Sequence, residues 1–311
     1  MTSHAETSPQ AASILPSHSS SGHGVTDPLP WLAVALSSNH PPRLVSFDVF
    51  DTLIWRRTLF PQDVFLSLST HLPRPSAWMR RQAERVATVA CRRLFGREPT
   101  LRDIYRLLPS DARRELALET KFCVPNPFCL AAVVWLRDIG IPVVAISDMY
   151  LDAEEIGGLL AACGYPPIPV YSSASEGCTK GGNGDLFAAA WGRIGTPPAD
   201  TAHVGDNPHS DITMAMRRGA AACHVATPRT TLFDIHPATP LSDSADDSIF
   251  WGELAIRLHL ETASDTNGKQ RFGRAIEILA QQQGIAQLPL EDAWRALQAL
   301  ASPPGDRRDA D

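Results

Sequence analysis

Short apolar runs alternate with longer helical patterns through the middle of the chain. Runs of this length that alternate with helices are typical of a parallel sheet covered on both faces. The runs are RLVSF, IPVVAIS, IPVYSS, TAHVGD and AACHVA, which begin at residues 43, 141, 168, 201 and 221. The sequence therefore predicts an α/β fold with a doubly wound parallel sheet.

About 90 residues separate the first run from the second, and they show helical periodicity only. A single crossover between parallel strands needs far fewer residues than this. We therefore predict a helical cap, residues 61–124, inserted between two parts of the core, residues 29–60 and residues 125–229.

The two ends of the chain have different patterns. Residues 1–28 are rich in Ser, His and Pro without periodicity, which predicts a disordered arm because such a segment buries too little apolar surface. After residue 229 the strand signals stop, and three helical patterns predict a C-terminal helical region over residues 230–303. Residues 304–311 are expected to form a flexible tail.

Composition narrows the class of protein. The 311 residues are 44% hydrophobic and 20% charged, which suits a globular core with a smaller second domain. The formal charge of −6 gives no basic surface, so neither nucleic acid nor membrane is an expected partner. The six cysteines form no Cys-x-x-Cys pair, which argues against a zinc knuckle or a disulfide framework. The apolar run at 31–36 is too short to cross a membrane and lacks the charged flank of a signal peptide, so we expect a cytoplasmic protein.

Polar residues follow four of the predicted strands. Asp48 ends the first run, Ser147 ends the second, Lys180 follows the third, and Asp206 and Asp211 lie in GDNPHSD after the fourth. The carboxyl ends of parallel strands meet at the crevice where open α/β sheets bind ligands. Each residue alone has a structural alternative as a turn, a helix cap or a solvated charge. Together they offer a nucleophile, donors for an anion's oxygens and carboxylates for a hard cation, a set that suits phosphoryl transfer.

The motifs resemble those of the haloacid dehalogenase (HAD) superfamily, whose members are mostly aspartyl-phosphate phosphatases. FDVFDTLIWR, AISDMYL, SSASEGCTKGGNGDLF and HVGDNPHSDI are similar to one bacterial branch with an FDxFDTL motif, and some relatives there are fused to glycosyltransferases of surface polysaccharide synthesis. The resemblance covers about residues 43–228. It implies a HAD Rossmannoid core with an inserted C1-type cap, here followed by a C-terminal helical appendage, and a glycosyltransferase as one partner.

The resemblance also implies roles for individual residues. Asp48 would be the nucleophile that forms an aspartyl-phosphate, and Ser147 and Lys180 would hold the phosphoryl oxygens. The expected cofactor is Mg²⁺. Its expected ligands are Asp48, the backbone carbonyl of Phe50, Asp206 and Asp211, the last either directly or through another ligand.

Residues near these motifs are candidates for binding the substrate. Thr52, Arg56 and Asp148 are expected there, Thr52 also as a brace of its loop through backbone hydrogen bonds. Arg56 has a surface salt bridge as its alternative. Glu119 is another candidate, for which we favour the alternative of a charge on a helix surface.

One position departs from the family pattern. The phosphatases carry an acid two residues after the nucleophile, and here that residue is Phe50. General acid–base catalysis typically contributes about 10² to 10⁴ in rate. Asp51 would replace the acid only through a bulge, because side chains alternate along a strand, so we expect it to hold the turn.

Three functions remain open. We expect a Mg²⁺-dependent phosphatase on a small phosphorylated metabolite, a sugar phosphate or a nucleotide, with an acid from the cap or an easy leaving group. A 2-haloacid dehalogenase-type hydrolase needs no acid because halide leaves without a proton, but it has no use for a carboxylate pair that suits a cation. A non-catalytic binding or regulatory module linked to polysaccharide synthesis is the third. The sequence does not identify the substrate, the oligomeric state or the role of the C-terminal helices.

Overall fold

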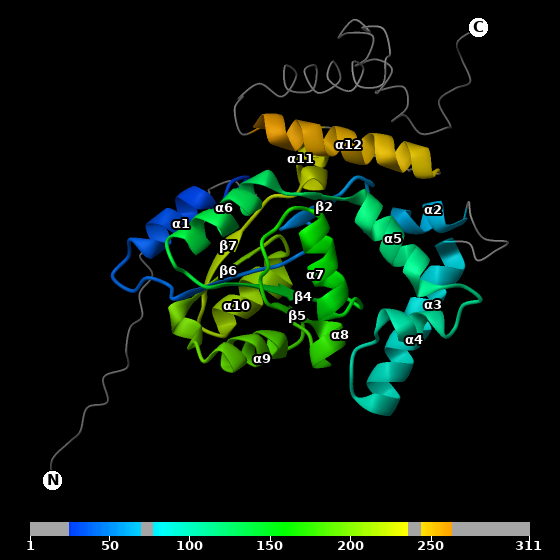
Figure 1. The fold of residues 1–311 in the computed structure, drawn as a ribbon, viewed down its shortest axis with the longest axis horizontal. Helices are drawn as coiled ribbons and strands as arrows, with labels where there is room; N and C mark the ends of the chain where they lie inside the picture. The colour runs from blue at the N-terminus through cyan, green and yellow to red at the C-terminus, as the bar shows by residue number, and fades with distance from the viewer. Residues whose placement is uncertain (1–24, 70–76, 236–243, 263–311) are drawn as a thin grey trace, which may run out of the picture.

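A five-stranded parallel sheet forms the centre of the computed structural model, which describes residues 25–69, 77–235 and 244–262 (Figure 1). The order across the sheet is β5-β4-β1-β6-β7, and all four strand pairs are parallel. The strands are β1 Leu44–Phe47, β4 Val143–Ser147, β5 Val170–Ser172, β6 Thr201–Gly205 and β7 Ala221–His224. The predicted doubly wound α/β fold is confirmed.

The inner strands of this sheet are buried throughout, because helices cover both of its faces. On one face, side chains such as Phe47 pack against α1 (Leu29–Leu36), α6 (Pro127–Asp138) and α7 (Ala153–Ala162). On the other, Leu44 and its neighbours pack against α9 and α10, which run over Asp185–Ile194 and Met214–Arg217. The strand order reverses beside β1, so the ligand crevice is expected at the carboxyl end of β1.

A two-stranded antiparallel ribbon joins the insertion to the core. Its strands are β2 (Ile54–Arg56), where the chain enters the insertion, and β3 (Cys123–Pro125), where it returns. The described residues between them form helices only, which lie beside the sheet and its flanking helices (Figure 1). These helices are η1 Pro61–Asp63, α2 Val64–Ser69, α3 Ala77–Ala90, η2 Cys91–Phe95, α4 Leu101–Tyr105 and α5 Ala112–Phe122.

The cap rests on the core through a buried polar cluster. The Arg80 guanidinium donates to both carboxylate oxygens of Glu115 at 2.5 and 2.6 Å, and the Tyr105 hydroxyl donates to Glu115 at 2.8 Å. Tyr150, in the loop after β4, places its ring 4.8 Å from that guanidinium and accepts a 2.7 Å hydrogen bond from the Leu101 amide through its backbone carbonyl. The loop after β4 is therefore attached to the cap by a side-chain contact and a backbone hydrogen bond.

In the described part of the chain after β7, two helices follow, α11 (Pro228–Ile235) and α12 (Ala245–Thr262), and they pack on each other and on Leu59. Gly252 of α12 touches the backbone of residues 57–58 so closely that a Cβ would lie 2.1 Å from the carbonyl oxygen of Arg57. α12 is therefore seated directly on the chain that enters the cap.

The remaining terminal predictions fall partly outside the described residues. Residues 1–24 of the expected arm and residues 263–311, with most of the helical region and the tail, lie outside them. Val25, in the segment expected to be an arm, pairs with Val225 beyond the end of β7.

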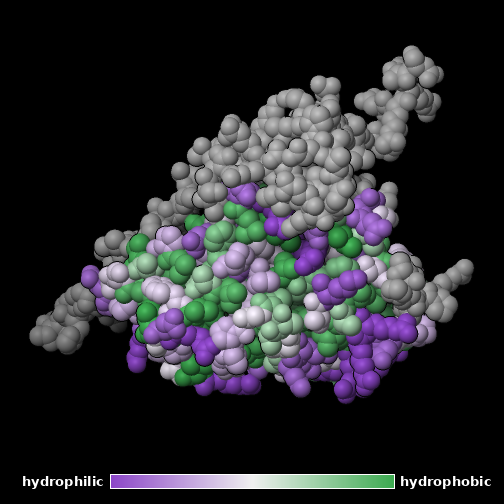
Figure 2. All heavy atoms as spheres, turned by 45° about the horizontal axis from the view of Figure 1, so that its top comes forward, coloured by the Kyte–Doolittle hydropathy of each residue, from purple (hydrophilic) through white to green (hydrophobic). Residues whose placement is uncertain are grey.

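The surface is of mixed polarity. Hydrophobic and hydrophilic side chains are interspersed over the face that Figure 2 presents. Within the described ranges, no helix combines the length and the apolar character needed to cross a bilayer.

Candidate functional site

The acidic residues of the motifs meet at the carboxyl edge of the sheet. Asp48 directly follows β1, and its amide donates to the Val204 carbonyl at 2.8 Å, which carries the β1–β6 pairing one residue past the strand. Asp206 directly follows β6, and η4 (Pro208–Thr213) carries Asp211. One carboxylate oxygen from each of the three acids lies within 4.8 Å of the others.

Lys180 brings a buried ammonium into this acidic cluster. Its Nζ donates to Asp48 Oδ1 and to Asp211 Oδ1, each at 2.5 Å. Burial alone would lower the pKa of Lys180, but the Asp211 and Asp48 carboxylates outweigh it and raise that pKa. The lysine therefore stays charged and offsets part of the negative charge of the site.

Asp148 fixes the loop that carries this lysine. Its two carboxylate oxygens accept hydrogen bonds from the amides of Lys180 and Gly181, at 2.8 and 3.1 Å. Its side chain is exposed at the end of β4, beside the buried Ser147. Ser147 lies where the sequence predicted it, at the carboxyl end of its strand.

Asp211 has hydrogen bonds on both oxygens. Besides the bond from Lys180, its Oδ2 accepts from the Asn207 amide at 2.9 Å. Burial opposes ionisation of Asp211, but the charge of Lys180 and contact with His203 hold its pKa well below the usual range. Gly205 is required for this packing, because a Cβ there would lie 2.5 Å from the Asp211 side chain.

The other two carboxylates are destabilised as anions. Burial raises the pKa of Asp48 to about 7, with Asp211 adding to the rise and Lys180 opposing it. Burial also raises the pKa of Asp206 well above its usual range, and the charges of Asp48, Asp51 and Asp211 reinforce that effect.

A hard divalent cation fits this donor set. Carboxylate oxygens are the ligands that Mg²⁺ prefers, and a cation would relieve the repulsion between Asp48 and Asp206. The two oxygens involved lie within 4.8 Å, close enough to share one ion. Both carboxylate oxygens of Asp211 already accept hydrogen bonds, from Lys180 and from the Asn207 amide. Asp211 is therefore suited to positioning Lys180 and the loop after β6.

The turn after Asp48 contains the position where HAD phosphatases carry their acid. Phe50 lies there, and the next residue, Asp51, has a φ of 61°, in the left-handed region that non-glycine residues adopt rarely. The Asp51 amide donates to the Ile54 carbonyl at 2.8 Å, and its carboxylate accepts from Arg229 Nη2 at 3.3 Å. The Thr52 hydroxyl, which is buried, donates to Asp206 Oδ1 at 3.4 Å.

A surface position is wrong for two residues, for Arg56 as the alternative to substrate binding and for Glu119 as a helix-surface charge. Arg56 and Glu119 are 8% and 1% exposed, and Arg56 donates to both Glu119 oxygens at 2.8 and 3.1 Å. They therefore form a buried pair and not a surface salt bridge, and Glu119 is not a surface charge. The Arg56 guanidinium lies 4.1 Å from the centre of the Phe50 ring, so the pair supports the turn after Asp48.

The structure adds three residues that sequence reasoning missed. His203 in β6 is buried with its Nε2 3.5 Å from Asp211 Oδ1, and burial lowers its pKa, so the ring is neutral. The His224 ring bonds the backbone carbonyl of Asp206 through Nε2 at 2.8 Å. Arg229 comes from α11, outside all four motifs. A polar residue inside an apolar strand, as at His203, was the one signal available in the sequence.

Comparison with known proteins gives a partial family match. Residues 183–246, about a fifth of the chain, match the family model described as HAD-hydrolase-like. This segment includes Asp206 and Asp211 but not Asp48 or Lys180. A comparison with curated proteins finds no significant match.

Solved structures with a similar fold include enzymes of two activities. L-2-haloacid dehalogenase from Xanthobacter autotrophicus, with chloropropionic acid covalently bound, is 18% identical, with 72% of this chain and 85% of that chain covered and a TM-score of 0.43. A HAD phosphatase from Thermococcus onnurineus is 19% identical, with coverages of 58% and 84% and a TM-score of 0.41. The HAD family enzyme BT-2542 from Bacteroides thetaiotaomicron, in complex with magnesium and inorganic phosphate, is 15% identical, with coverages of 59% and 93% and a TM-score of 0.39. Likeness at this level does not decide between the activities.

Proposed function

We propose that this chain is a HAD-type hydrolase, a Mg²⁺-dependent phosphatase that acts on a small phosphorylated metabolite through an aspartyl-phosphate at Asp48. The main support is the contact of Asp48 with Lys180 inside a cluster of three carboxylates at the switch point of the sheet. A nucleophile, a fixed cation and oxygen ligands for a metal then lie within one site.

Asp48 is the attacking group. One of its carboxylate oxygens forms a bond to phosphorus as the bond from phosphorus to the leaving oxygen breaks, and the leaving oxygen keeps the electron pair. Water then attacks the acyl phosphate, releases inorganic phosphate and restores the carboxylate. Lys180 supplies fixed positive charge 2.5 Å from the nucleophile, and Ser147 supplies a hydroxyl for a phosphoryl oxygen.

The metal site is made by the same edge of the sheet. Asp48, Asp206 and the backbone carbonyl of Phe50 would hold Mg²⁺, with Asp211 keeping Lys180 in place. When bound, the ion supplies positive charge for the phosphoryl oxygens. Thr52 orients Asp206 through its hydroxyl, and His224 holds the backbone of the same residue.

Protonation of the leaving oxygen is the weak step. Phe50 carries no proton to donate, and the Asp51 carboxylate is bonded to the guanidinium of Arg229. The proton then comes from water or from a group brought by the substrate, so esters with a good leaving group are expected to react fastest. Without a positioned acid, a loss of about 10² to 10⁴ is expected for alkyl phosphates.

The same Phe50 favours a second candidate, hydrolysis of a 2-haloacid, because halide leaves without a proton. Three carboxylates with oxygens within 4.8 Å count against it, since that reaction needs no cation. A binding module without turnover would also be consistent with Phe50.

The test is phosphate release from an aryl phosphate, sugar phosphates and nucleotides, with Mg²⁺ or with EDTA. Asp48→Asn is compared with wild type and with Asp185→Asn, an acid 57% exposed in a surface ion pair, as the matched control. We expect metal-dependent release that Asp48→Asn abolishes and Asp185→Asn retains. Metal-independent halide release from a 2-haloacid, or no release of either product, would contradict the proposal and favour the second candidate or the binding module respectively.

A further inference from the structure

A cleft of about 640 Å³ lies between the cap and the loops that carry the proposed catalytic groups. Its core wall includes Asp148, which follows Ser147, and Thr179 and Gly181, which flank Lys180. Its cap wall comes from α3, η2 and the segment before α4. The cleft is therefore lined by the sequence neighbours of Ser147 and Lys180, the two groups expected to hold a phosphoryl group.

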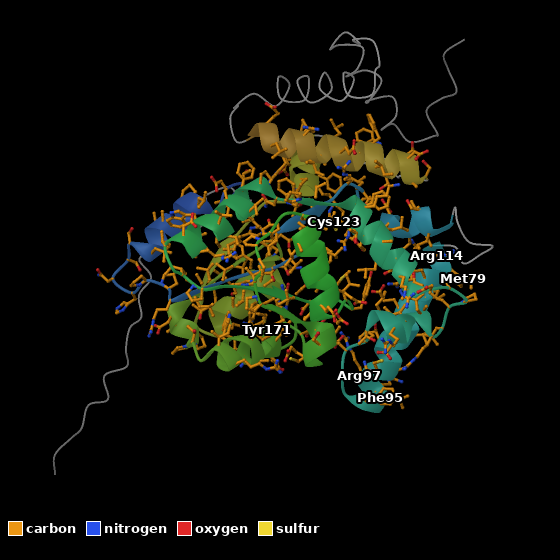
Figure 3. The ribbon with its side chains drawn as sticks, in the orientation of Figure 1. Met79, Phe95, Arg97, Arg114, Cys123 and Tyr171 are labelled. Carbon is orange, nitrogen blue, oxygen red and sulfur yellow. The ribbon has the colours of Figure 1, made fainter. Side chains whose placement is uncertain are left out.

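Direct contacts between cap and core frame this cleft. The Leu101 amide donates to the Tyr150 carbonyl at 2.7 Å. Arg97, labelled at the foot of the cap in Figure 3, is in van der Waals range of Gly177: a Cβ added to Gly177 would lie 3.4 Å from the Arg97 Cβ.

The charges on its walls are mostly negative. Glu84 and Glu98 face it from the cap, and Asp148 faces it from the core. Arg92 is the one basic residue among the described lining residues, and it already donates to both oxygens of Glu98, at 2.8 and 3.0 Å. The carboxylates have partners too, since Arg80 donates to Glu84 at 2.9 Å and the amides of Lys180 and Gly181 donate to Asp148. Among the described lining residues, however, three anionic groups stand against one guanidinium, so a second phosphate would meet a net negative wall.

The same walls suit hydroxyl groups. Carboxylate oxygens accept hydrogen bonds from hydroxyls, and the hydroxyls of Thr88 and Thr179 add neutral partners. Tyr150 is the one aromatic residue among the described lining residues, and its ring already faces the Arg80 guanidinium at 4.8 Å. The carboxylate oxygens already accept hydrogen bonds within the protein, but each can accept a second one, so the cleft offers acceptors for hydroxyl groups and little for stacking a base.

We propose that this cleft holds the leaving part of the substrate, and that this part is an uncharged polyhydroxylated group, a sugar or a polyol carrying a single phosphate. The proposal rests on the proposed phosphatase function for the place of the phosphate. It excludes bisphosphates and nucleotides as preferred substrates, and Glu98 is the residue expected to discriminate against a second phosphate.

The test measures binding, so that it does not depend on turnover. Asp48→Asn is titrated calorimetrically, in Mg²⁺, with a hexose monophosphate, the bisphosphate of the same hexose and a nucleoside monophosphate. The monophosphate is expected to bind at least tenfold more tightly than either competitor. Phosphate release from an aryl phosphate by wild type reports the proposed function separately.

Two added variants connect the preference to the cleft. Glu98→Gln removes a wall charge and frees Arg92, so it is expected to reduce the discrimination against the bisphosphate at least threefold. Glu176→Gln is the matched control, since Glu176 also pairs with an exposed arginine, Arg193, but lies outside the cleft lining. It should leave the ratio unchanged.

Equal or tighter binding of the bisphosphate or the nucleotide would overturn the inference, as would no binding of the monophosphate. An unchanged ratio in Glu98→Gln would overturn it too, because the preference would then arise elsewhere. If the aryl phosphate is hydrolysed in either case, the phosphatase proposal still stands.

Discussion

Replacing Arg80 by methionine tests whether the cap is held by its buried ion pair. The Arg80 and Glu115 side chains are 2% and 0% exposed, and two hydrogen bonds of 2.5 and 2.6 Å join them. Methionine keeps much of the side-chain volume but removes the charge. The Glu115 carboxylate would then be buried with one described hydrogen bond, from the Tyr105 hydroxyl.

The expected cost follows from that burial. Removing one partner of a buried ion pair destabilises a protein by about 3 to 5 kcal/mol, because the other charge is left without compensation. Domains are stable by about 5 to 15 kcal/mol, so this loss is a large part of the total. By contrast, Arg92 is 58% exposed in its pair with Glu98, and pairs of that kind contribute about 0 to 1 kcal/mol.

The measurement is the free energy of unfolding from urea titrations followed by circular dichroism. We compare Arg80→Met, Arg92→Met as the matched control, Glu115→Gln and the double variant of Arg80 and Glu115. The double variant should be more stable than Arg80→Met, since no buried charge remains unpaired. A cost for Arg80→Met no larger than that of Arg92→Met would refute the reasoning.

Three further outcomes are expected. Gly252→Ala should lower the free energy of unfolding by about 1 to 3 kcal/mol, because the new Cβ would lie 2.1 Å from the backbone oxygen of Arg57. Gly192→Ala is the control and should not lower it, since a Cβ there has nothing within 4 Å. In EDTA, wild type should lose stability relative to Asp48→Asn as the pH rises from 5 to 8. The pKa of Asp48 is raised from 3.8 to about 7, so the folded state favours the protonated carboxyl, and this contribution is lost as the pH rises towards 7. At about 1.4 kcal/mol per pH unit, the difference in the free energy of unfolding grows by up to about 3 kcal/mol. A flat difference in urea titrations across that range would contradict this. Lys180→Met should slow phosphate release by about 10² to 10³, and the exposed Lys121→Met should not; equal rates for both variants would rule out the role given to Lys180.

Much of the core could be predicted because each strand can be recognised from its own few residues. Each inner strand is a short apolar run. Ser147 ends its strand, and Asp48 and Asp206 directly follow theirs, so each is placed at the shared edge whatever the rest of the chain does. The same topology brings Lys180 to this edge, but its pairing with two carboxylates was not predicted, because Lys180 was expected only to hold phosphoryl oxygens.

The missed features depend on partners far along the chain. Arg56 and Glu119 each look solvated in sequence, because nothing local shows that a partner 63 residues away will neutralise the charge. The β2–β3 ribbon was missed because three residues are too few to show a period. Arg229 belongs to a helix outside the motifs, and only the packing of α11 brings it to Asp51.

The β2–β3 ribbon makes the cap a replaceable module. Arg56 and Cys123 are paired neighbours, so the chain leaves the core and comes back at the same place. Paired Cα atoms of an antiparallel ribbon lie about 4.5 to 5.5 Å apart, a gap that a short hairpin loop closes. Because doubling the length of a loop adds only about 0.6 kcal/mol to the cost of closing it, this junction accepts insertions of very different length. An exchanged cap would have to supply an acid in the place of Glu119, the buried partner of Arg56, while the edge of the sheet that carries Asp48 and Asp206 belongs to the core.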